Sequence, residues 1–272
     1  MINKIFIFLF GSMIGSFLNV CIHRLPEEDP KKRSVVMPRS HCPYCGKTIR
    51  WYDNIPFLSY ILLGGKCRFC KARISIRYFA VELITACFFL FFYNIYGLSF
   101  NFILYTTFIS GLIVSTFVDI KHRIIPDEIS VGGVFMGLFL GLAHGFKLNP
   151  LVFNYRPLLD SFLGVIIGGG IIYLTGFLFD VVYFKLLKKP PIQGETSSMG
   201  GGDVKLLAMI GAFLGWQQAV FTFFAAPLFG LGFALINLVV KKDHTMPYGP
   251  FLSLAALLSI FYFDKIIALL FI

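Results

Sequence analysis

The sequence predicts an all-α, polytopic membrane protein with eight transmembrane helices and one small soluble loop domain. Of its 272 residues, 57% are hydrophobic and only 14% are charged, which lies outside the range of soluble domains. The apolar residues gather into runs of roughly 20, the length that crosses a bilayer as a helix. The cationic residues lie mostly between these runs, so the net charge of +10 indicates membrane topology rather than nucleic-acid binding.

The apolar runs divide the chain into three expected regions. These are a first transmembrane helix over 1–22, a loop domain over 23–79 and a seven-helix membrane body over 80–272. The eight crossings are expected near 3–22, 80–98, 101–118, 128–146, 158–180, 204–219, 221–240 and 250–271. Because the first run lacks a small-x-small cleavage site and carries Gly, Ser and Asn, we expect a retained, packed helix and no cleavable signal peptide.

The distribution of Lys and Arg predicts how the chain is oriented. Eight crossings place both termini on one side of the membrane and the loops 23–79, 119–127, 181–203 and 241–249 on the other. With Lys205 at its boundary, the second side holds 20 of the 24 Lys and Arg residues. By the positive-inside rule this side faces the cytoplasm, so both termini are expected outside a cell membrane. The cations also attract anionic headgroups, which makes lipid the expected partner, and not nucleic acid.

Two Cys-x-x-Cys pairs, separated by 21 residues, lie in the loop 23–79. The four thiols are Cys42, Cys45, Cys67 and Cys70. This spacing is just beyond that of most zinc ribbons, and four thiolates complete the tetrahedral shell of a structural Zn²⁺. A domain this small has too little hydrophobic core to be stable alone, so it needs stabilisation by a bound metal ion. Disulfides are the less favoured alternative in a reducing cytosol, and His41 is expected to be a surface neighbour of the site.

Two acidic residues occupy matching positions at the ends of apolar runs. Asp203 follows three consecutive glycines where a polar loop meets an apolar run, and Asp119 closes the run 101–118. Glycines remove side-chain bulk, so another backbone, such as that of a substrate, can approach Asp203 closely. The alternative is that Asp203 only N-caps a helix beginning at Val204. The matching position of Asp119 favours a functional acid pair.

Both acid-bearing segments resemble the motifs of the type IV prepilin peptidase family, which are membrane aspartic proteases of the GxGD type. Residues 200–206, which read GGGDVKL, are similar to the family's second catalytic motif, and Asp119 with 124–127, which read IIPD, to its first. Further similar segments are 15–20, 24–26 and 54–56. The resemblance therefore covers most of the chain, in family order, and points to the bifunctional bacterial members.

The resemblance implies an activity and a site. Asp119 and Asp203 are expected to be the catalytic dyad of an aspartic endopeptidase that cleaves type IV prepilins and pseudopilins after a leader-ending glycine, on the cytoplasmic side. It also implies N-methylation of the new N-terminal residue, with S-adenosylmethionine as methyl donor. No soluble methyltransferase fold is visible in the sequence, so this second activity rests on the resemblance.

The resemblance assigns further residues around these two activities. Gly200, Gly202 and Lys205 are expected to shape the loop and the substrate path. Asn19 and Glu82 are expected to take part in methyl transfer, although a polar Asn in a membrane helix also has the plain role of bonding a neighbouring helix. The segment 247–250 is expected near the active site. Asp127 has a sufficient role as an acid at a helix N-terminus, so we do not count it as catalytic.

Two functions of other classes compete with this reading. A transporter or channel uses intramembrane acids to carry ions, but such acids should lie near mid-bilayer, whereas Asp119 and Asp203 are expected at one edge. A non-enzymatic membrane adaptor built on a zinc ribbon explains the cysteines and leaves the acid pair without a role. A cleavage assay separates the three.

Overall fold

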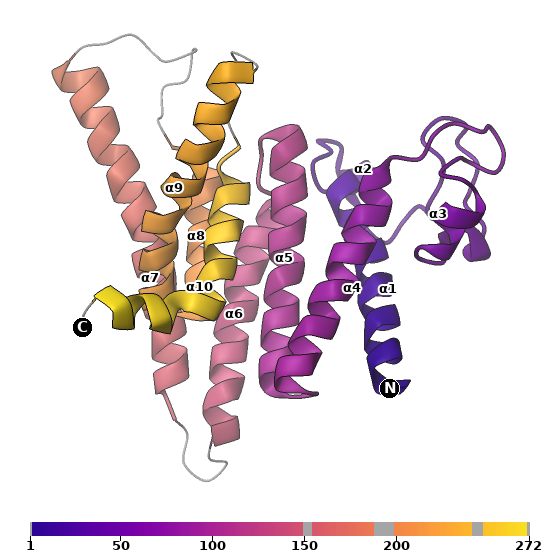
Figure 1. Cartoon of the computed structure of the whole chain (residues 1–272). Coiled ribbons are helices and arrows are strands. Elements are labelled where there is room, and N and C mark those ends of the chain that lie inside the picture. The colour runs from indigo at the N-terminus through magenta and orange to yellow at the C-terminus, as the bar shows by residue number, and fades with distance from the viewer. Residues whose placement is uncertain (1, 149–153, 188–198, 241–246, 271–272) are drawn as a thin grey trace. The chain divides into compact units, whose positions relative to one another are not determined.

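The structure is a computed structural model that describes residues 2–148, 154–187, 199–240 and 247–270 (Figure 1). Every regular element in these residues is helical, apart from two isolated β-bridges in the cysteine-containing loop. The chain forms two compact units, Met1–Val118 and Asp119–Ile272. The predicted all-α class is confirmed.

The first unit contains α1 (Ile2–Arg24), α4 (Ile76–Tyr96), most of α5 (Phe100–His122) and the loop between α1 and α4. Short helices punctuate this loop: α2 (Pro30–Arg33), η1 (Trp51–Asn54) and α3 (Leu58–Leu62). Helices α1 and α4 lie side by side (Figure 1), and glycines make the contact close. A Cβ atom at Gly15 would lie 2.7 Å from the Cα of Glu82, and one at Gly11 would lie 2.8 Å from the Cβ of Phe89. The expected packing of the first helix is therefore confirmed.

The second unit is organised around a short, buried helix, α8 (Gly201–Leu214), which contacts all of the other long helices of the unit. These are α6 (Asp127–Leu148), α7 (Arg156–Asp180), α9 (Trp216–Val240) and α10 (Gly249–Leu270). Residues 206–213 of α8 are buried. At the crossing of α7 and α8, a Cβ on Gly164 would lie 2.0 Å from the carbonyl oxygen of Gly211. Only glycine on both helices allows this approach, so α8 is fixed at the centre of the unit.

Glycines that repeat every four residues also bring α6 close to its neighbouring helices. A Cβ on Gly133 would lie 2.4 Å from the sulfur of Met209, and one on Gly137 would lie 2.7 Å from the Cβ of Ala212. Gly141 faces Ser161 of α7. Every fourth residue of α6 thus contacts a neighbouring helix, which is the role expected of small residues in lipid.

Six helices of the described residues are long and apolar enough to cross a membrane. They are Ile2–Arg24, Ile76–Tyr96, Phe100–His122, Asp127–Phe146, Arg156–Leu186 and Gly249–Leu269. Helix α8 has 14 residues and is therefore about 21 Å long, which is shorter than the roughly 30 Å hydrocarbon core of a bilayer. The chain is a multi-pass membrane protein.

Several predicted boundaries are wrong. Helix α8 begins at Gly201 and not at Val204, so Asp203 lies inside its first turn and is not an N-cap. The break expected between the crossings 204–219 and 221–240 lies earlier, at Gly215, whose φ of +88° suits glycine, and α9 starts at Trp216. Helical structure continues from α7 to Leu186, where a loop was expected from 181. The remainder of that loop lies outside the described residues, as does most of the loop 241–249.

Candidate active site

The two predicted acids lie in the same unit and influence each other electrostatically. Asp119 belongs to the last turns of α5 and is 6% exposed. Asp203 is the third residue of α8 and is half-buried. The charge of Asp119 acts on the carboxyl group of Asp203, which requires the two groups to be close. Two carboxyls this close cannot both ionise freely, so the pair meets the first requirement of an acid dyad.

A third segment completes the surroundings of Asp119. Gly249, the first residue of α10, donates its backbone N–H to Oδ2 of Asp119 at 2.9 Å. Tyr248, the residue before Gly249, lies close to Asp203. Burial raises the pKa of the Tyr248 hydroxyl and the charge of Asp203 raises it further, to about 12. The expectation that 247–250 lies beside the acids is confirmed. Tyr248 therefore stays a neutral hydrogen-bonding group across the physiological pH range.

The glycines around the acids have distinct surroundings. A Cβ on Gly202 would lie 3.2 Å from the Cβ of Ile125, and one on Gly200 would lie 3.2 Å from Oδ2 of Asp203. A Cβ on Gly201 would meet nothing within 4 Å. A Cβ on Gly249 would lie only 2.8 Å from Oδ2 of Asp119. The tightest requirement for glycine at the acid pair is therefore at Gly249, and the close neighbour of Gly202 is this chain's own Ile125.

Lys205 and Asp127 form an ion pair between the two acid-bearing segments. The Lys205 Nζ donates to Oδ1 of Asp127 at 2.7 Å, and the side chains are 43% and 61% exposed. An exposed pair of this kind contributes about 0.2–1 kcal/mol. Lys205 thus contacts the segment that carries the first motif, and Asp127 has a partner in addition to the helix terminus expected for it.

The four predicted cysteines form one cluster in the first unit. The Sγ atoms of Cys42, Cys45, Cys67 and Cys70 all lie within 4.8 Å of one another. The Cys42 and Cys70 sulfurs are 3.8 Å apart, which is far longer than a disulfide bond. Four sulfurs at 2.3 Å from a tetrahedral zinc ion are separated by about 3.8 Å. The cluster can hold a metal ion with this geometry. His41 is exposed and its ring contacts the Arg39 carbonyl, outside the cluster.

The two Cys-x-x-Cys turns have the same backbone hydrogen bonds. In the first turn, Cys42 N–H donates to the carbonyl of Lys47 and Gly46 N–H to that of Cys42. In the second, Cys67 N–H donates to Ala72 and Lys71 N–H to Cys67. The residue after the second cysteine of each pair has a left-handed backbone conformation, with a φ of +67° at Gly46 and +60° at Lys71. The N–H groups of Cys70 and Phe69 lower the pKa of the Cys67 thiol to about 6, which favours the thiolate that a metal binds.

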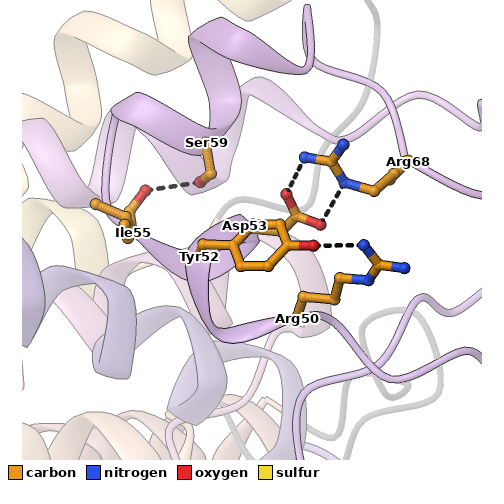
Figure 2. Close-up of polar contacts among 6 residues, drawn as sticks. All are labelled: Arg50, Tyr52, Asp53, Ile55, Ser59 and Arg68. Carbon is orange, nitrogen blue, oxygen red and sulfur yellow. Dashed lines mark hydrogen bonds and ion pairs between the residues drawn. The ribbon is translucent and has the colours of Figure 1, made fainter.

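A bidentate ion pair links the second of these turns to η1 (Figure 2). Arg68 donates from Nε and from one terminal nitrogen to the two oxygens of Asp53, at 2.8 and 2.6 Å. The guanidinium of Arg68 lowers the pKa of Asp53. Arg50 donates to the hydroxyl of Tyr52 on the same side. The segment that follows η1 is therefore tied to the cysteine cluster.

That segment reaches a buried acid on α4. The backbone N–H of Phe57 donates to Oε2 of Glu82 at 3.0 Å, and the Phe57 ring lies 5.6 Å from each of the Phe8 and Phe79 rings. Phe57 has a φ of +61°, which non-glycine residues rarely adopt. Asn19, the other residue predicted for methyl transfer, lies on α1 and donates to the Tyr78 carbonyl of α4 at 2.9 Å. The structure brings Asn19 and Glu82 to the same helix interface.

Sequence reasoning missed three contacts of these sites. The sequence does not indicate that the N–H of Gly249 bonds Asp119 or that the N–H of Phe57 bonds Glu82, because the two partners are separated by 130 and 25 residues, respectively. The ion pair of Asp53 and Arg68 had a signal, since they are oppositely charged residues in one small domain. The exposure of the pair is unequal, with side chains 6% and 42% exposed, and only the structure reveals this.

Comparisons with known proteins cover both units. A model of the Bacterial Peptidase A24 N-terminal domain matches residues 9–96, and a model of the Type IV leader peptidase family matches residues 106–235. A protein named prepilin leader peptidase/N-methyltransferase from Pseudomonas aeruginosa is 33% identical over 95% of this chain and 90% of its own length. Its namesake from Dichelobacter nodosus is 35% identical, over 94% and 91%, and that from Aeromonas salmonicida 32% identical, over 96% and 91%. No solved structure matches the chain.

Proposed function

Because the chain belongs to the type IV leader peptidase family, we propose that it is a membrane-embedded prepilin peptidase that also N-methylates the product of its cleavage. The single observation that carries the proposal is the acid pair, in which two carboxyls from α5 and α8 act on each other inside one unit. This chain covers about nine-tenths of the length of relatives whose names give both activities, which supports assigning both to it.

Asp119 and Asp203 are the proposed catalytic residues. An aspartic dyad works with one ionised and one protonated carboxyl, and the two titrate as a unit. The ionised member takes a proton from the attacking water, and the protonated member donates a hydrogen bond to the scissile carbonyl. The N–H of Gly249 fixes one oxygen of Asp119 and leaves the other oxygen for this exchange. Lys205, with Gly200 and Gly202, shapes the segment that carries Asp203.

The substrates we propose are type IV prepilins and pseudopilins, cut after the leader-ending glycine. The eight helices α1, α4, α5, α6, α7, α8, α9 and α10 are the proposed membrane spans, with both termini outside and the acid pair on the cytoplasmic side of the cell membrane. The Lys/Arg-rich loops support this orientation, and lipid headgroups rather than nucleic acid are their proposed partners. An engineered cysteine at position 154 should react with a membrane-impermeant reagent added outside intact cells, and one at position 28 should not.

The cysteine cluster is proposed to hold a structural Zn²⁺. Bound zinc closes a shell of four thiolates and stabilises the loop domain. The ion pair of Arg68 and Asp53 then connects this domain to the segment that contacts Glu82. Methyl transfer from S-adenosylmethionine, with Asn19 and Glu82 taking part, is the proposed activity of the first unit.

The proposal is tested with the full-length protein, purified in detergent, and a prepilin that carries its leader. Mass spectrometry of the product should show cleavage after the glycine, and a further 14 Da, the mass of one added methylene, when S-adenosylmethionine is present. An uncleaved prepilin in the presence of folded, zinc-containing protein would contradict the proposal and favour a transporter or an adaptor. A cleaved but unmethylated product would leave only the peptidase.

A further inference from the structure

The interface between α1 and α4 contains an acceptor-rich polar cluster, which we define as Ser16, Asn19, the Tyr78 carbonyl and Glu82. From the chemistry of this cluster we propose that Glu82 and Asn19 bind a protonated primary amine, and that this amine is the N-terminus of the cleaved substrate. The identification of the amine rests on the proposed function. The binding of an amine by these two side chains rests on the contacts given below.

Asn19 has a buried acceptor without a partner. Its residue is 2% exposed, and its Nδ2 donates to the carbonyls of Tyr78 and Gly15 at 2.9 and 3.3 Å. Exchanging the amide's oxygen and nitrogen would set the oxygen against these two carbonyls, so the orientation is fixed by its partners. The Oδ1 is buried and has no hydrogen-bond partner among the described residues. A buried amide oxygen left without a donor is unfavourable, so this atom calls for a donor from elsewhere.

Glu82 is a buried acid whose hydrogen-bond partners in the described residues are uncharged. It is 8% exposed, and it accepts from the Phe57 N–H while Ser16 lies within hydrogen-bonding range. No ion pair joins it to a cationic side chain in the part of the chain that the structure describes. A carboxylate has about four lone-pair sites, so acceptor capacity remains. An uncompensated acid within a membrane helix indicates function by default.

The two acceptors are within reach of a single ligand nitrogen. Tyr78, which Asn19 contacts, is four residues before Glu82 on α4, and Gly15, which packs on Glu82, is four residues before Asn19 on α1. The two residues therefore lie about one helical turn, or about 6 Å, apart along the interface. The contacts of Asn19 with Tyr78 and of Gly15 with Glu82 show that the two helices run in opposite directions, and each side chain leans toward the N-terminus of its own helix, so the two side chains lean toward each other. An ammonium nitrogen whose tetrahedral N–H groups donate at about 2.7–2.9 Å to two acceptors joins oxygens up to about 4.7 Å apart. This placement suits one –NH₃⁺ group held between Glu82 and Asn19.

The donor requirement separates an ammonium group from the sulfonium centre of the methyl donor. An ammonium group carries three N–H donors and a positive charge, which satisfies the Asn19 oxygen and the Glu82 carboxylate together. The sulfonium of a methyl donor is also positive but bears only carbon substituents, so it leaves the amide oxygen without an N–H partner. S-adenosylmethionine also carries an α-ammonium group with three N–H donors, so the choice of the cleaved substrate's amine over that of the methyl donor rests on the proposed function and is decided by the KM comparison below.

The test is direct binding of a fluorescent peptide that begins at the first residue of a mature type IV pilin. The peptide is compared with its N-acetylated form on the full-length wild-type protein, by fluorescence anisotropy. We expect the free amine to bind at least about tenfold more tightly, since hydrogen bonds to charged groups have this magnitude. Equal binding of the two peptides by the wild type would overturn the inference, and this comparison needs no variant.

Glu82→Gln identifies the residue and distinguishes the two cations. It should remove the preference for the free amine and raise the KM for that peptide at least about tenfold, with the KM for S-adenosylmethionine within about twofold of wild type. Thr85→Val is the matched control, because Thr85 is buried one turn further along α4 and bonds only the Val81 carbonyl of its own helix. A rise in the KM for S-adenosylmethionine alone would overturn the assignment to the substrate's amine and indicate that the methyl donor binds at this cluster.

The same experiment separates this inference from the proposed function. A wild type that prefers the free amine but neither cleaves nor methylates keeps the amine site and removes the proposed function. A wild type that carries out both reactions and binds both peptides equally keeps the proposed function and removes the amine site. Zinc content and prepilin cleavage by Glu82→Gln report whether that variant is folded.

Discussion

Each unit of the chain has a buried carboxylate that accepts a backbone N–H from a residue distant in the sequence. In Met1–Val118, Glu82 accepts from Phe57 at 3.0 Å, and in Asp119–Ile272, Asp119 accepts from Gly249 at 2.9 Å. Both acids are less than a tenth exposed. A main-chain donor fixes a carboxylate oxygen without a competing positive charge, so the acid keeps its reactivity toward a ligand or water.

The neighbour of each carboxylate differs, and this decides its chemistry. Asp119 is accompanied by Asp203, a second acid, and a pair of acids can share and exchange a proton. Glu82 shares the interface of α1 and α4 with Asn19, an amide that does not ionise. A carboxylate beside an amide can bind a cation but cannot form an aspartic dyad. The comparison therefore predicts cleavage in the second unit and recognition of an amine in the first.

The largest expected effect comes from breaking the dyad. Asp119→Asn and Asp203→Asn should each lower the rate of prepilin cleavage by at least about 10²–10⁴-fold, since an amide can neither take nor supply the shared proton. Methylation of an already cleaved peptide should stay within about twofold of wild type. Both rates are measured by mass spectrometry on membrane-inserted, purified variants. Cleavage at a near wild-type rate by either variant would remove the acid pair as the catalytic site.

Removing the metal should affect the first unit more than the second. Cys42→Ser or Cys67→Ser should reduce bound zinc to near zero and lower methyl transfer by more than tenfold, because metal binding supplies much of the folding free energy of such a domain. Cleavage should fall less, since the acid pair lies in the other unit. Zinc per chain is measured by elemental analysis alongside both rates. Cys87→Ser, outside the cluster, is the control.

If the two activities fall equally, the loop domain also shapes the protease site. A wild-type protein purified without chelators that contains no zinc would contradict the metal assignment itself.

A single methyl group should perturb the acid pair without removing a carboxyl. Gly249→Ala places a Cβ 2.8 Å from Oδ2 of Asp119, so the carboxyl must move, and we expect cleavage to fall roughly 10–100-fold. Gly201→Ala is the matched control, because its Cβ meets nothing within 4 Å although it lies two residues from Asp203. Initial cleavage rates at saturating prepilin make the comparison. Equal rates for the two variants would show that the position of Asp119 is not critical.

The smallest effect is expected from the exposed ion pair. Lys205→Met and Asp127→Asn should each lower cleavage at most about fivefold, because an exposed pair contributes about 0.2–1 kcal/mol. The double variant should lose no more than either single variant, since both remove the same interaction. A double-mutant cycle on cleavage rates gives this coupling. A loss of 100-fold or more for Asp127→Asn would place that residue in the catalytic machinery.

The fold class and the acid and cysteine positions could be predicted because their signals are local. Glycines beside Asp203, an apolar run ending at Asp119 and two Cys-x-x-Cys pairs are each read within a few residues. The exact start of α8 could not be predicted, because Gly201 and Gly202 are poor helix formers that tertiary packing holds in the first turn. The end of α8 at Gly215 depends on a positive φ at one residue, and several nearby residues suited a turn equally well.

The contacts that orient the acids were beyond the sequence for a different reason. Gly249 and Phe57 contribute only backbone N–H groups, which every residue but proline possesses, so no residue type marks them. The unpartnered oxygen of Asn19 depends on which way its amide faces, and that is set by the Tyr78 carbonyl on another helix. These features exist only once two helices are packed together.

The most direct test of the central claim, that cleavage and methyl transfer belong to separate carboxylate sites, is a mixing experiment. Asp119→Asn and Glu82→Gln proteins are incubated with prepilin and S-adenosylmethionine, singly and together, and the product is weighed by mass spectrometry. The account predicts uncleaved prepilin with Asp119→Asn, a cleaved product largely lacking the methyl group with Glu82→Gln at limiting substrate, and a cleaved, methylated product from the mixture. A mixture that yields no more methylated product than Glu82→Gln alone would contradict it.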